Sequence, residues 1–235
     1  MNQGELDWLD WREVAPRRGC LPPEPGEVHV WQFELTPAAD DEALLDSAEL
    51  ARMRRFVQAR DRARYLAAHG WTRRILGAYL DRPATALRFA RAADGKPRLD
   101  GAALRFNLSH SASIGLLAVG VDAELGVDVE AWREVDATLA DAVLSAGERA
   151  TLRGRAPDAA RLLGCWTRKE ACLKALGCGL LRDPRGIDVG VDGGTRVVLG
   201  VELRALPLPD GYSAALAVVG GCRRTRLLRA RRTAQ

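Results

Sequence analysis

Two carboxylates stand two residues apart in the segment Gly126-Val-Asp-Val-Glu130. The alternating valines predict a β-strand, in which Asp128 and Glu130 project from one face and the valines from the other. Neighbouring carboxylates repel each other unless a cation or a proton neutralises them. A hard cation such as Mg²⁺ suits this pair, because it binds few protein carboxylates and leaves room for substrate phosphates. A strand whose polar face is simply hydrated explains the same pattern.

A second charged group lies in Trp166-Thr-Arg-Lys-Glu-Ala-Cys-Leu-Lys174. On a helix, Trp166, Glu170 and Lys174 share one face, whereas Lys169 is turned away by about 100°. An indole on that face draws the adjacent charges toward the interior. Glu170 is then a candidate metal ligand or base, beside a phosphate-binding Lys174. The same spacing is that of an ordinary surface ion pair, so both interpretations stay open.

Polar groups also end the predicted strand Phe106-Asn-Leu-Ser-His-Ser111. Ser109 and His110 offer a hydroxyl and an imidazole where loop residues commonly meet ligands. Adjacent residues of an extended chain point apart, and no Gly-x-Ser-x-Gly turn is present, so a hydrolase pair is not favoured. The segment is interpreted either as an anion-binding site or as a capped turn.

Lysine is rare in this chain, since 35 residues are Lys or Arg and only Lys96, Lys169 and Lys174 are lysines. Lysine is a compact, mobile charge, whereas arginine is a rigid fork. The three lysines therefore indicate a need for an ammonium group, although chance explains them equally well. Arg52 and Arg64, on two arginine-rich predicted helices, are candidate phosphate contacts because arginine binds phosphate with two hydrogen bonds.

The elements that must position these residues follow an α+β order. The first 26 residues, rich in Pro, Gly and charge, predict an irregular arm. Periodicity then predicts strands at 28–35, 87–91, 104–108, 114–121, 125–130, 186–191, 197–204 and 212–219, and helices at 47–57, 61–80, 136–144, 145–153 and 159–176. Helices followed by strands thus occur twice, which favours two similarly built halves, 1–125 and 126–235.

The composition is that of a soluble globular protein, with 47% hydrophobic and 28% charged residues. No apolar run approaches a membrane span of about 20 residues, and the N-terminus lacks the features of a signal peptide. Five cysteines without a Cys-x-x-Cys pair indicate neither a zinc site nor a disulfide framework, so a cytoplasmic location is expected. The net charge is +4, and arginines crowd the stretch 223–235, which is interpreted as a basic tail, either partner-binding or simply solvated.

No glycine-rich dinucleotide loop, Walker loop or His-Glu-x-x-His helix occurs. Carboxylates suited to Mg²⁺ together with Lys, Arg, Ser and His donors describe a nucleotide-like or pyrophosphate substrate. The three segments 106–111, 126–130 and 166–174, supported by Gly95-Lys-Pro97, resemble in order and spacing those of the surfactin-type 4′-phosphopantetheinyl transferases. The likeness covers residues 45–220.

This resemblance implies a pseudo-twofold α+β fold, in which each half is a small antiparallel sheet packed with helices. CoA and Mg²⁺, or Mn²⁺ in its place, would lie between the CoA-binding first half and a second half that carries the metal and catalytic motifs. The reaction implied is transfer of the 4′-phosphopantetheine arm of CoA to a serine of an acidic apo acyl or peptidyl carrier protein, with release of 3′,5′-ADP. A monomer is implied as well.

Residue by residue, the resemblance implies three overlapping groups. The metal ligands are Asp128, Glu130 and Glu170, and the catalytic residues are Glu170, Lys174 and Asp128. The CoA contacts are Arg52, Arg64, Lys96, Ser109, His110, Lys169 and Lys174. Glu49 and Cys178 depart from the family, because each stands where relatives often carry a basic residue. Glu148 matches a further acidic position of open role.

Two other function classes compete with this one. A non-catalytic protein of the same fold would bind CoA and a carrier without turnover, but it would not need Asp128, Glu170 and Lys174 intact. Nucleic-acid binding through the C-terminal arginines predicts a steep dependence of affinity on salt and leaves the carboxylates unexplained. We therefore expect neither nucleic acid nor a membrane as a partner.

Overall fold

The structure is a computed structural model that describes residues 12–92, 95–152, 158–179 and 182–231. Its larger sheet has five strands in the order β1-β11-β2-β6-β5. These are β1 (Arg12–Val14), β11 (Arg224–Ala230), β2 (Glu27–Glu34), β6 (Ile114–Val121) and β5 (Leu104–Ser111). Strand β11 runs parallel to both β1 and β2, whereas the pairs β2–β6 and β6–β5 are antiparallel.

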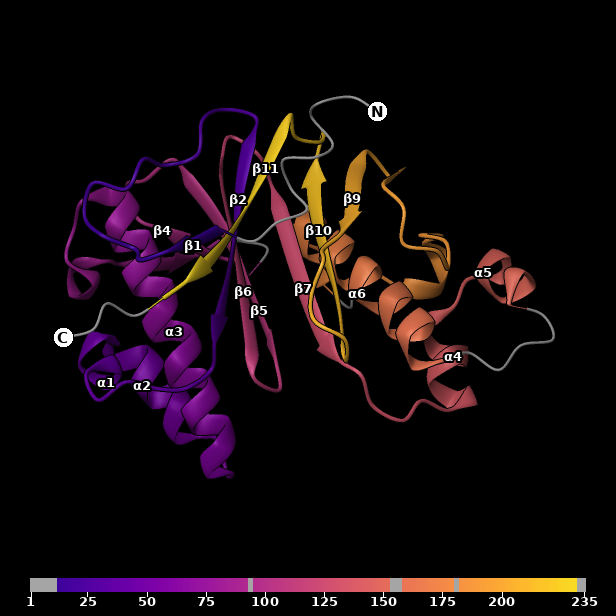
Figure 1. Cartoon of the computed structure of the whole chain (residues 1–235), viewed down its shortest axis with the longest axis horizontal. Coiled ribbons are helices and arrows are strands. Elements are labelled where there is room, and N and C mark those ends of the chain that lie inside the picture. The colour runs from indigo at the N-terminus through magenta and orange to yellow at the C-terminus, as the bar shows by residue number, and fades with distance from the viewer. Residues whose placement is uncertain (1–11, 93–94, 153–157, 180–181, 232–235) are drawn as a thin grey trace.

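A smaller, fully antiparallel sheet has the order β7-β10-β9-β8. Its strands are β7 (Leu125–Ala131), β10 (Tyr212–Val219), β9 (Val201–Ala205) and β8 (Arg196–Val198). A separate ribbon pairs β3 (Phe89–Arg91) with β4 (Pro97–Leu99). Figure 1 shows the two main sheets side by side at the centre of the molecule.

Helices cover the outer face of each sheet (Figure 1). On one side lie α1 (Asp41–Leu44), α2 (Ser47–Arg54), α3 (Ala59–Leu80) and the 3₁₀ turn η2 (Ala84–Ala86), and on the other α4 (Ala137–Val143), α5 (Ala146–Thr151), α6 (Ala159–Leu176) and the 3₁₀ turn η4 (Pro184–Gly186). This mixture confirms the α+β prediction. The pseudo-twofold relation and the boundary at 125/126 stay predictions.

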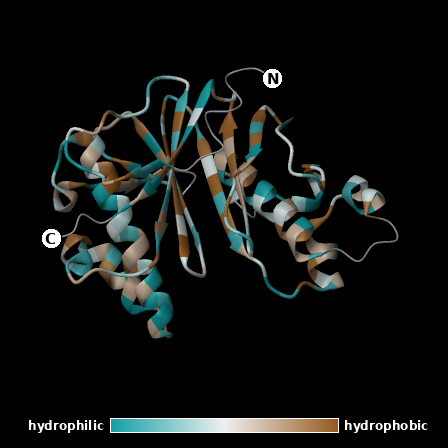
Figure 2. Cartoon of the chain, viewed as in Figure 1, coloured by the Kyte–Doolittle hydropathy of each residue, from teal (hydrophilic) through white to brown (hydrophobic). Residues whose placement is uncertain are grey.

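The alternation of apolar side chains along the strands explains the layers. On β2, Val30 packs into the core between the two sheets, whereas Trp31 and Phe33 pack toward α3. On β7, Val127 and Val129 join the same inter-sheet core. Figure 2 shows hydrophobic residues recurring along these central strands. Because period-two alternation fills both faces, Asp128 and Glu130 fall on the face of β7 that α6 covers.

The two sheets meet where the edge strand β5 lies against the edge strand β7. The Asn107 Oδ1 atom accepts from the Val127 N–H at 2.9 Å, and Ser111 Oγ accepts from the Ala131 N–H at 3.0 Å. Ser109 Oγ accepts from the Val129 N–H at 3.4 Å. From Asn107 onward, every second side chain of β5 thus binds the free backbone edge of β7, so the polar motif of residues 106–111 joins the two sheets.

The C-terminal arginines belong to a strand over the described part of the stretch 223–235, which corrects the prediction of a basic tail there. Arg226 Nε is 2.5 Å from Glu27 Oε1, while Leu227 and Leu228 are buried. The apolar residues between the arginines supply the reason, since Leu227 packs into the core between the sheets and Leu228 into the core beneath α3. The predicted irregular arm likewise contributes β1, which pairs with β11.

Two predicted strands also differ. The stretch 197–204 turns back on itself at Leu199 and Gly200, which both have positive φ, so it forms β8 and β9 instead of one strand. The stretch 186–191 forms no strand, because side chains bind its backbone: Glu148 Oε1 accepts from the Val189 N–H at 2.8 Å, and Arg168 donates to the Gly190 carbonyl at 2.6 Å.

Over the described residues, no helix is both long and apolar enough to cross a bilayer. All five cysteines are free thiols.

Candidate active site

Ser109, Asp128 and Lys174 form one hydrogen-bonded cluster at the junction of the two sheets. Asp128 Oδ1 accepts from Lys174 Nζ at 2.7 Å and from Ser109 Oγ at 2.9 Å. Lys174 Nζ also donates to Ser109 Oγ and to the Val127 carbonyl, each at 3.2 Å. Strands β5 and β7 and helix α6 thus each contribute one member, and the three predicted segments converge.

Gly126 explains how Lys174 reaches this position. A Cβ atom added at Gly126 would lie 2.6 Å from the backbone nitrogen of Ala175 and closer still to the Ala171 carbonyl oxygen. Only glycine therefore lets the α6 backbone rest directly on β7. The same close approach brings the Lys174 side chain over Asp128, two residues along the strand.

Two buried carboxylate oxygens near the cluster, Asp128 Oδ2 and Glu170 Oε1, have no hydrogen-bond partner in the described part of the chain. Burial raises the pKa of Asp128, an effect that Lys174 and the Ser109 hydroxyl partly offset and Glu130 increases. Burial also raises the pKa of Glu170, and the charges of Asp128 and Glu130 add to the effect while Lys174 opposes it. The carboxylates of Asp128, Glu130 and Glu170 therefore influence one another electrostatically, although the first two lie on β7 and the third on α6.

The predicted metal ligands are not assembled into a closed set. Among the described residues, no group of three or more His, Cys, Asp or Glu side chains stands ready to hold a metal ion. Glu130 Oε2 accepts from Arg133 at 3.0 Å and from Ser111 Oγ at 3.3 Å. The unpartnered oxygens of Asp128 and Glu170 are nevertheless the donors that a hard cation requires. The metal role of Asp128, Glu130 and Glu170 thus stays a prediction.

His110, next to Ser109, is exposed at the end of β5. The protein around its ring disfavours the charged form and so lowers the pKa of His110, and the neighbouring His69, Lys174 and Arg64 lower it further. Arg64 lies on α3, 3.5 Å from Asp61, and Arg52 is exposed on α2. Basic groups from β5 and the α2–α3 pair are therefore available to an anionic ligand.

Lys96 lies outside the cluster, between β3 and β4. Its Nζ donates to the Ala175 carbonyl at 2.9 Å and to Glu124 Oε2 at 3.1 Å. The first bond attaches the β3–β4 ribbon to the last turn of α6, and the second attaches it to the residue before β7. A contact between Lys96 and CoA stays a prediction, and it would compete with both bonds.

Lys169 requires a correction, because it is fully buried and cannot contact CoA. Its Nζ is 2.7 Å from Glu148 Oε2 and donates to the Val143 carbonyl at 2.6 Å and to the Pro184 carbonyl at 3.0 Å. The turn of about 100° away from Glu170 points Lys169 into the core behind α6. Glu148, whose role was open, thereby gains a structural one.

The two departures from the family also have internal partners. Glu49 completes the N-terminal capping box of α2 and binds His69 Nδ1 at 2.9 Å and Arg73 Nε at 2.7 Å. Cys178 Sγ donates to the Leu173 carbonyl at 3.8 Å, just after the end of α6. The sequence signal for Glu49 was the spacing Asp46-x-x-Glu49, a capping box. No comparable signal marked Asn107 and Gly126, which align the sheets and α6.

Comparison with known proteins agrees with this geometry. Residues 118–217 match the family model of the 4′-phosphopantetheinyl transferase superfamily, and residues 31–121 match that of the 4′-phosphopantetheinyl transferase N-terminal domain. The 4′-phosphopantetheinyl transferase HetI of Nostoc sp. is 36% identical over 169 residues, which are 66% of this chain and 71% of HetI.

Two further relatives match over shorter stretches. A putative 4′-phosphopantetheinyl transferase of Synechocystis sp. is 32% identical over 59% of both chains. The 4′-phosphopantetheinyl transferase AcpT of Salmonella typhimurium is 42% identical over 35% of this chain and 46% of its own. From these matches and from the convergence of the three sequence segments, the chain belongs to the 4′-phosphopantetheinyl transferase superfamily and is an enzyme of that class.

Proposed function

We propose that this enzyme transfers the 4′-phosphopantetheine arm from CoA to a serine hydroxyl of an apo acyl or peptidyl carrier protein. The observation that carries the proposal is the cluster of Ser109, Asp128 and Lys174, with the unpartnered oxygens of Asp128 and Glu170 beside it. The superfamily supplies the transferase class. The cluster supplies a fixed ammonium group and carboxylates suited to a pyrophosphate.

The reaction has a simple balance. The serine oxygen bonds to the phosphorus that carries pantetheine, and the bond from this phosphorus to the bridging oxygen breaks. The electron pair of that bond leaves with 3′,5′-ADP, and the serine proton passes to a base. Such a transfer requires positioning, stabilisation of the developing negative charge and uptake of one proton.

Lys174 and Glu170 match two of these requirements. The Lys174 ammonium, held by Asp128, would stabilise the charge that develops on the leaving phosphate. The raised pKa of Glu170, caused first by burial and then by Asp128, makes it a stronger base than an ordinary carboxylate. Glu170 would take the serine proton directly or through a water molecule.

Asp128 and Glu170 also fit a divalent cation, since each has a buried carboxylate oxygen without a partner. Glu130 is the third ligand of the proposal, and it would have to exchange its contact with Arg133. Mg²⁺, or Mn²⁺, would supply Lewis-acid stabilisation of the phosphate charges. His110, Arg64, Arg52 and Ser109 are the proposed CoA contacts, and we propose a cytoplasmic monomer.

The test is to incubate the purified enzyme with CoA, Mg²⁺ and apo carriers from fatty-acid, polyketide and peptide synthases, and to weigh each carrier by mass spectrometry. A carrier heavier by one phosphopantetheine arm, and no gain in the presence of EDTA, is expected. Measurable CoA binding without a mass gain on any carrier would instead identify a non-catalytic binding protein and overturn the proposal.

A further inference from the structure

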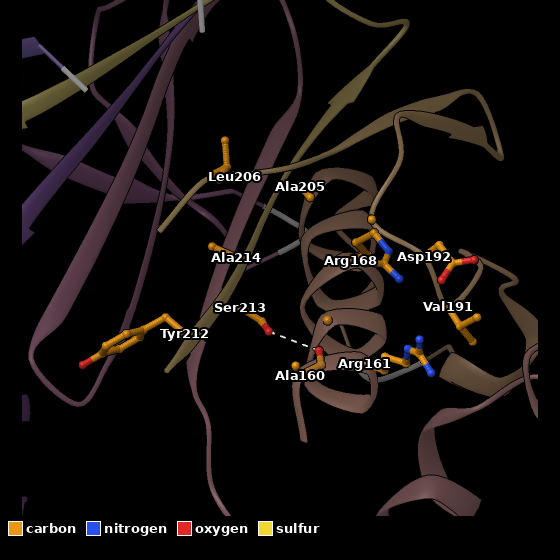
Figure 3. A pocket seen from close by; sticks show the side chains of 12 residues that line it. Ala160, Arg161, Arg168, Val191, Asp192, Ala205, Leu206, Tyr212, Ser213 and Ala214 are labelled. Carbon is orange, nitrogen blue, oxygen red and sulfur yellow. Dashed lines mark hydrogen bonds between the residues drawn. The ribbon is translucent and has the colours of Figure 1, made fainter. Parts of the chain in front are cut away.

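A pocket lined by Arg161 and Arg168 lies beside α6 (Figure 3). Its volume is about 360 Å³, and it is bounded by the first half of α6, the start of β10 and residues 191–193. The α6 positions 160, 164 and 168 share one helix face, and Glu170 is turned from Arg168 by about 200°. Arg168 therefore lies on a different side of α6 from Glu170, although the pocket adjoins the proposed active site where Ser213 stands opposite Glu130 in the β10–β7 pairing.

Arg168 brings a buried charge to this pocket. Only 3% of this residue is exposed, and its Nη2 atom donates to the Gly190 carbonyl at 2.6 Å. The Nε atom is buried and has no hydrogen-bond partner among the described residues. No carboxylate of those residues pairs with this guanidinium. Because a buried unpaired charge is costly, an anion is the natural partner.

The other lining residues define what kind of anion fits. Arg161 adds a second positive charge and Asp192 a negative one, so the charged side chains of the pocket sum to +1. Ala160, Val191 and Ala205 supply apolar contact surface, whereas the Leu206 and Tyr212 side chains pack into the core between the two sheets. The Ser213 hydroxyl is already engaged, since it accepts from Trp132 Nε1 at 2.9 Å and donates to the Ala160 carbonyl at 3.4 Å (Figure 3).

We propose that this pocket binds a small organic monocarboxylate, with its carboxylate on Arg168 and its apolar part against Ala160, Val191 and Ala205. The planar guanidinium matches a carboxylate. The charge balance favours a monoanion, because Asp192 repels a phosphate dianion. The volume lies at the lower end of the range of roughly 300–1,000 Å³ found for small-molecule pockets.

The ligand class is tested by isothermal titration calorimetry with benzoate, with its neutral analogue benzamide and with inorganic phosphate. Benzoate is expected to bind at least about tenfold more tightly than either of the others. Equal affinity for benzoate and benzamide would show that the pocket does not recognise the negative charge of the carboxylate. Tighter binding of phosphate would show that the pocket is not selective for a monocarboxylate. Either outcome overturns the proposal.

The place of binding is tested with Gly164→Leu, which fills the pocket from α6. A Cβ at Gly164 meets only ordinary contacts, 3.5 Å from Arg168 Nη1 and 3.9 Å from Ser213 Oγ, and leucine favours a helix over glycine. Benzoate affinity should fall at least about tenfold in Gly164→Leu and in Arg168→Met. It should stay unchanged in Lys174→Ala and in Arg185→Gln, whose arginine is exposed and pairs with Asp183.

Arg168→Met also loses the bond to the Gly190 carbonyl, so Gly164→Leu decides the question if that variant does not fold. Unchanged benzoate affinity in folded Gly164→Leu, or its loss in Lys174→Ala, would place the carboxylate elsewhere and overturn the proposal. The transferase reaction is not needed for any of these readouts, so the two proposals can fail independently.

Discussion

Lys174 is held in place by neighbouring groups of the protein itself. Its ammonium contacts Asp128 Oδ1, Ser109 Oγ and the Val127 carbonyl, which come from two strands of different sheets. A cation fixed in this way loses little further freedom when it meets a developing negative charge, and such preorganisation is a large part of catalysis. Substitutions of Lys174 and of the neighbouring Glu170 are therefore expected to change the rate of transfer in ways that can be measured.

Replacing Lys174 by alanine should lower kcat of carrier modification by about 100-fold or more, as removal of a charge-stabilising donor does in other enzymes. The KM for CoA should change much less, because His110, Arg64 and Arg52 keep their positions. Steady-state kinetics measured by carrier mass, with Arg185→Gln as the matched control, provide the check. An unchanged kcat would exclude a catalytic role for Lys174.

Glu170→Gln should lower the transfer rate by about 100-fold or more, since it removes the proposed base. The same change should stabilise the fold at neutral pH. A carboxylate whose pKa is raised on folding destabilises the folded state above its ordinary pKa, and the neutral amide removes that penalty. Thermal unfolding at pH 7.5 and carrier mass together test this pair of outcomes, and a wild-type rate would contradict the assignment.

The sequence predicts well which faces Asp128, Glu170 and Lys174 occupy. Residues two apart share a face of a strand, and residues four apart share a face of a helix. The predicted CoA contact of Lys169 is wrong, because the helical angle gives the direction of this side chain but not the neighbours that it meets. The partner that buries Lys169 is Glu148, which lies 21 residues earlier and on another helix. Pairings across such a distance depend on tertiary packing.

At the level of elements, α6 is positioned by its direct contact with β7. The contact depends on Gly126, whose missing side chain leaves room for the α6 backbone at Ala171 and Ala175. Just past the middle of α6, the buried pair of Lys169 and Glu148 attaches this helix to α5. The helix therefore has little freedom to carry Glu170 and Lys174 away from Asp128.

Gly126→Ala should displace α6 and lower the free energy of unfolding by about 1–3 kcal/mol, as overpacking of a core usually does. The transfer rate should fall as well, because Lys174 moves with the helix. Gly186→Ala is the control, since a Cβ at Gly186 meets no atom within 4 Å and that residue has no positive φ. Chemical denaturation of both variants tests the argument, and equal stabilities would refute it.

Elements with strong periodicity and clear end signals are predicted correctly, such as the helix that begins after Asp158 and ends at Gly177. Prediction fails where side chains from other elements take over the backbone hydrogen bonds, as Glu148 and Arg168 do near residue 190. Strand β11 is not predicted, because its arginines give the segment the composition of a solvated end. In the structure Glu27 pairs with Arg224 and Arg226, so these charges are compensated within the sheet.

At the scale of the whole molecule, a buried polar network joins β2, β11 and α3. His29 Nδ1 lies 2.6 Å from the Tyr79 hydroxyl, which also accepts from Trp31 Nε1 at 2.7 Å. Glu27 lies 3.3 Å from His29 Nε2 and 2.5 Å from Arg226 Nε. Three distant segments of the chain therefore depend on the protonation state of one histidine and one glutamate.

This network should make the fold sensitive to acid. Burial lowers the pKa of His29 below 6.5, although Glu27 opposes the effect. Burial alone would raise the pKa of Glu27, but the Glu24 N–H, His29 and Arg226 together lower it below 4.5. Both groups bind protons more readily when unfolded, so stability is present above these values and is lost as the pH falls through them.

The expected result is a loss of stability that begins near pH 6.5 and grows below pH 4.5. In His29→Gln the first part of this loss should be absent, even if the variant is less stable at pH 7.5. Urea denaturation from pH 4 to 8 measures both curves. A wild-type curve that is flat between pH 7.5 and 5.5 would show that His29 does not titrate on unfolding.

The pairing of β11 with β2 has a consequence for how the protein is made. Strand β2 is synthesised almost 200 residues before β11, which lies between it and β1 in the larger sheet. During translation this sheet therefore lacks a strand until the smaller sheet and α6 have already left the ribosome. The open edge of β2 would then be exposed to pairing with other chains. A chaperone that shields this edge would help the nascent chain most.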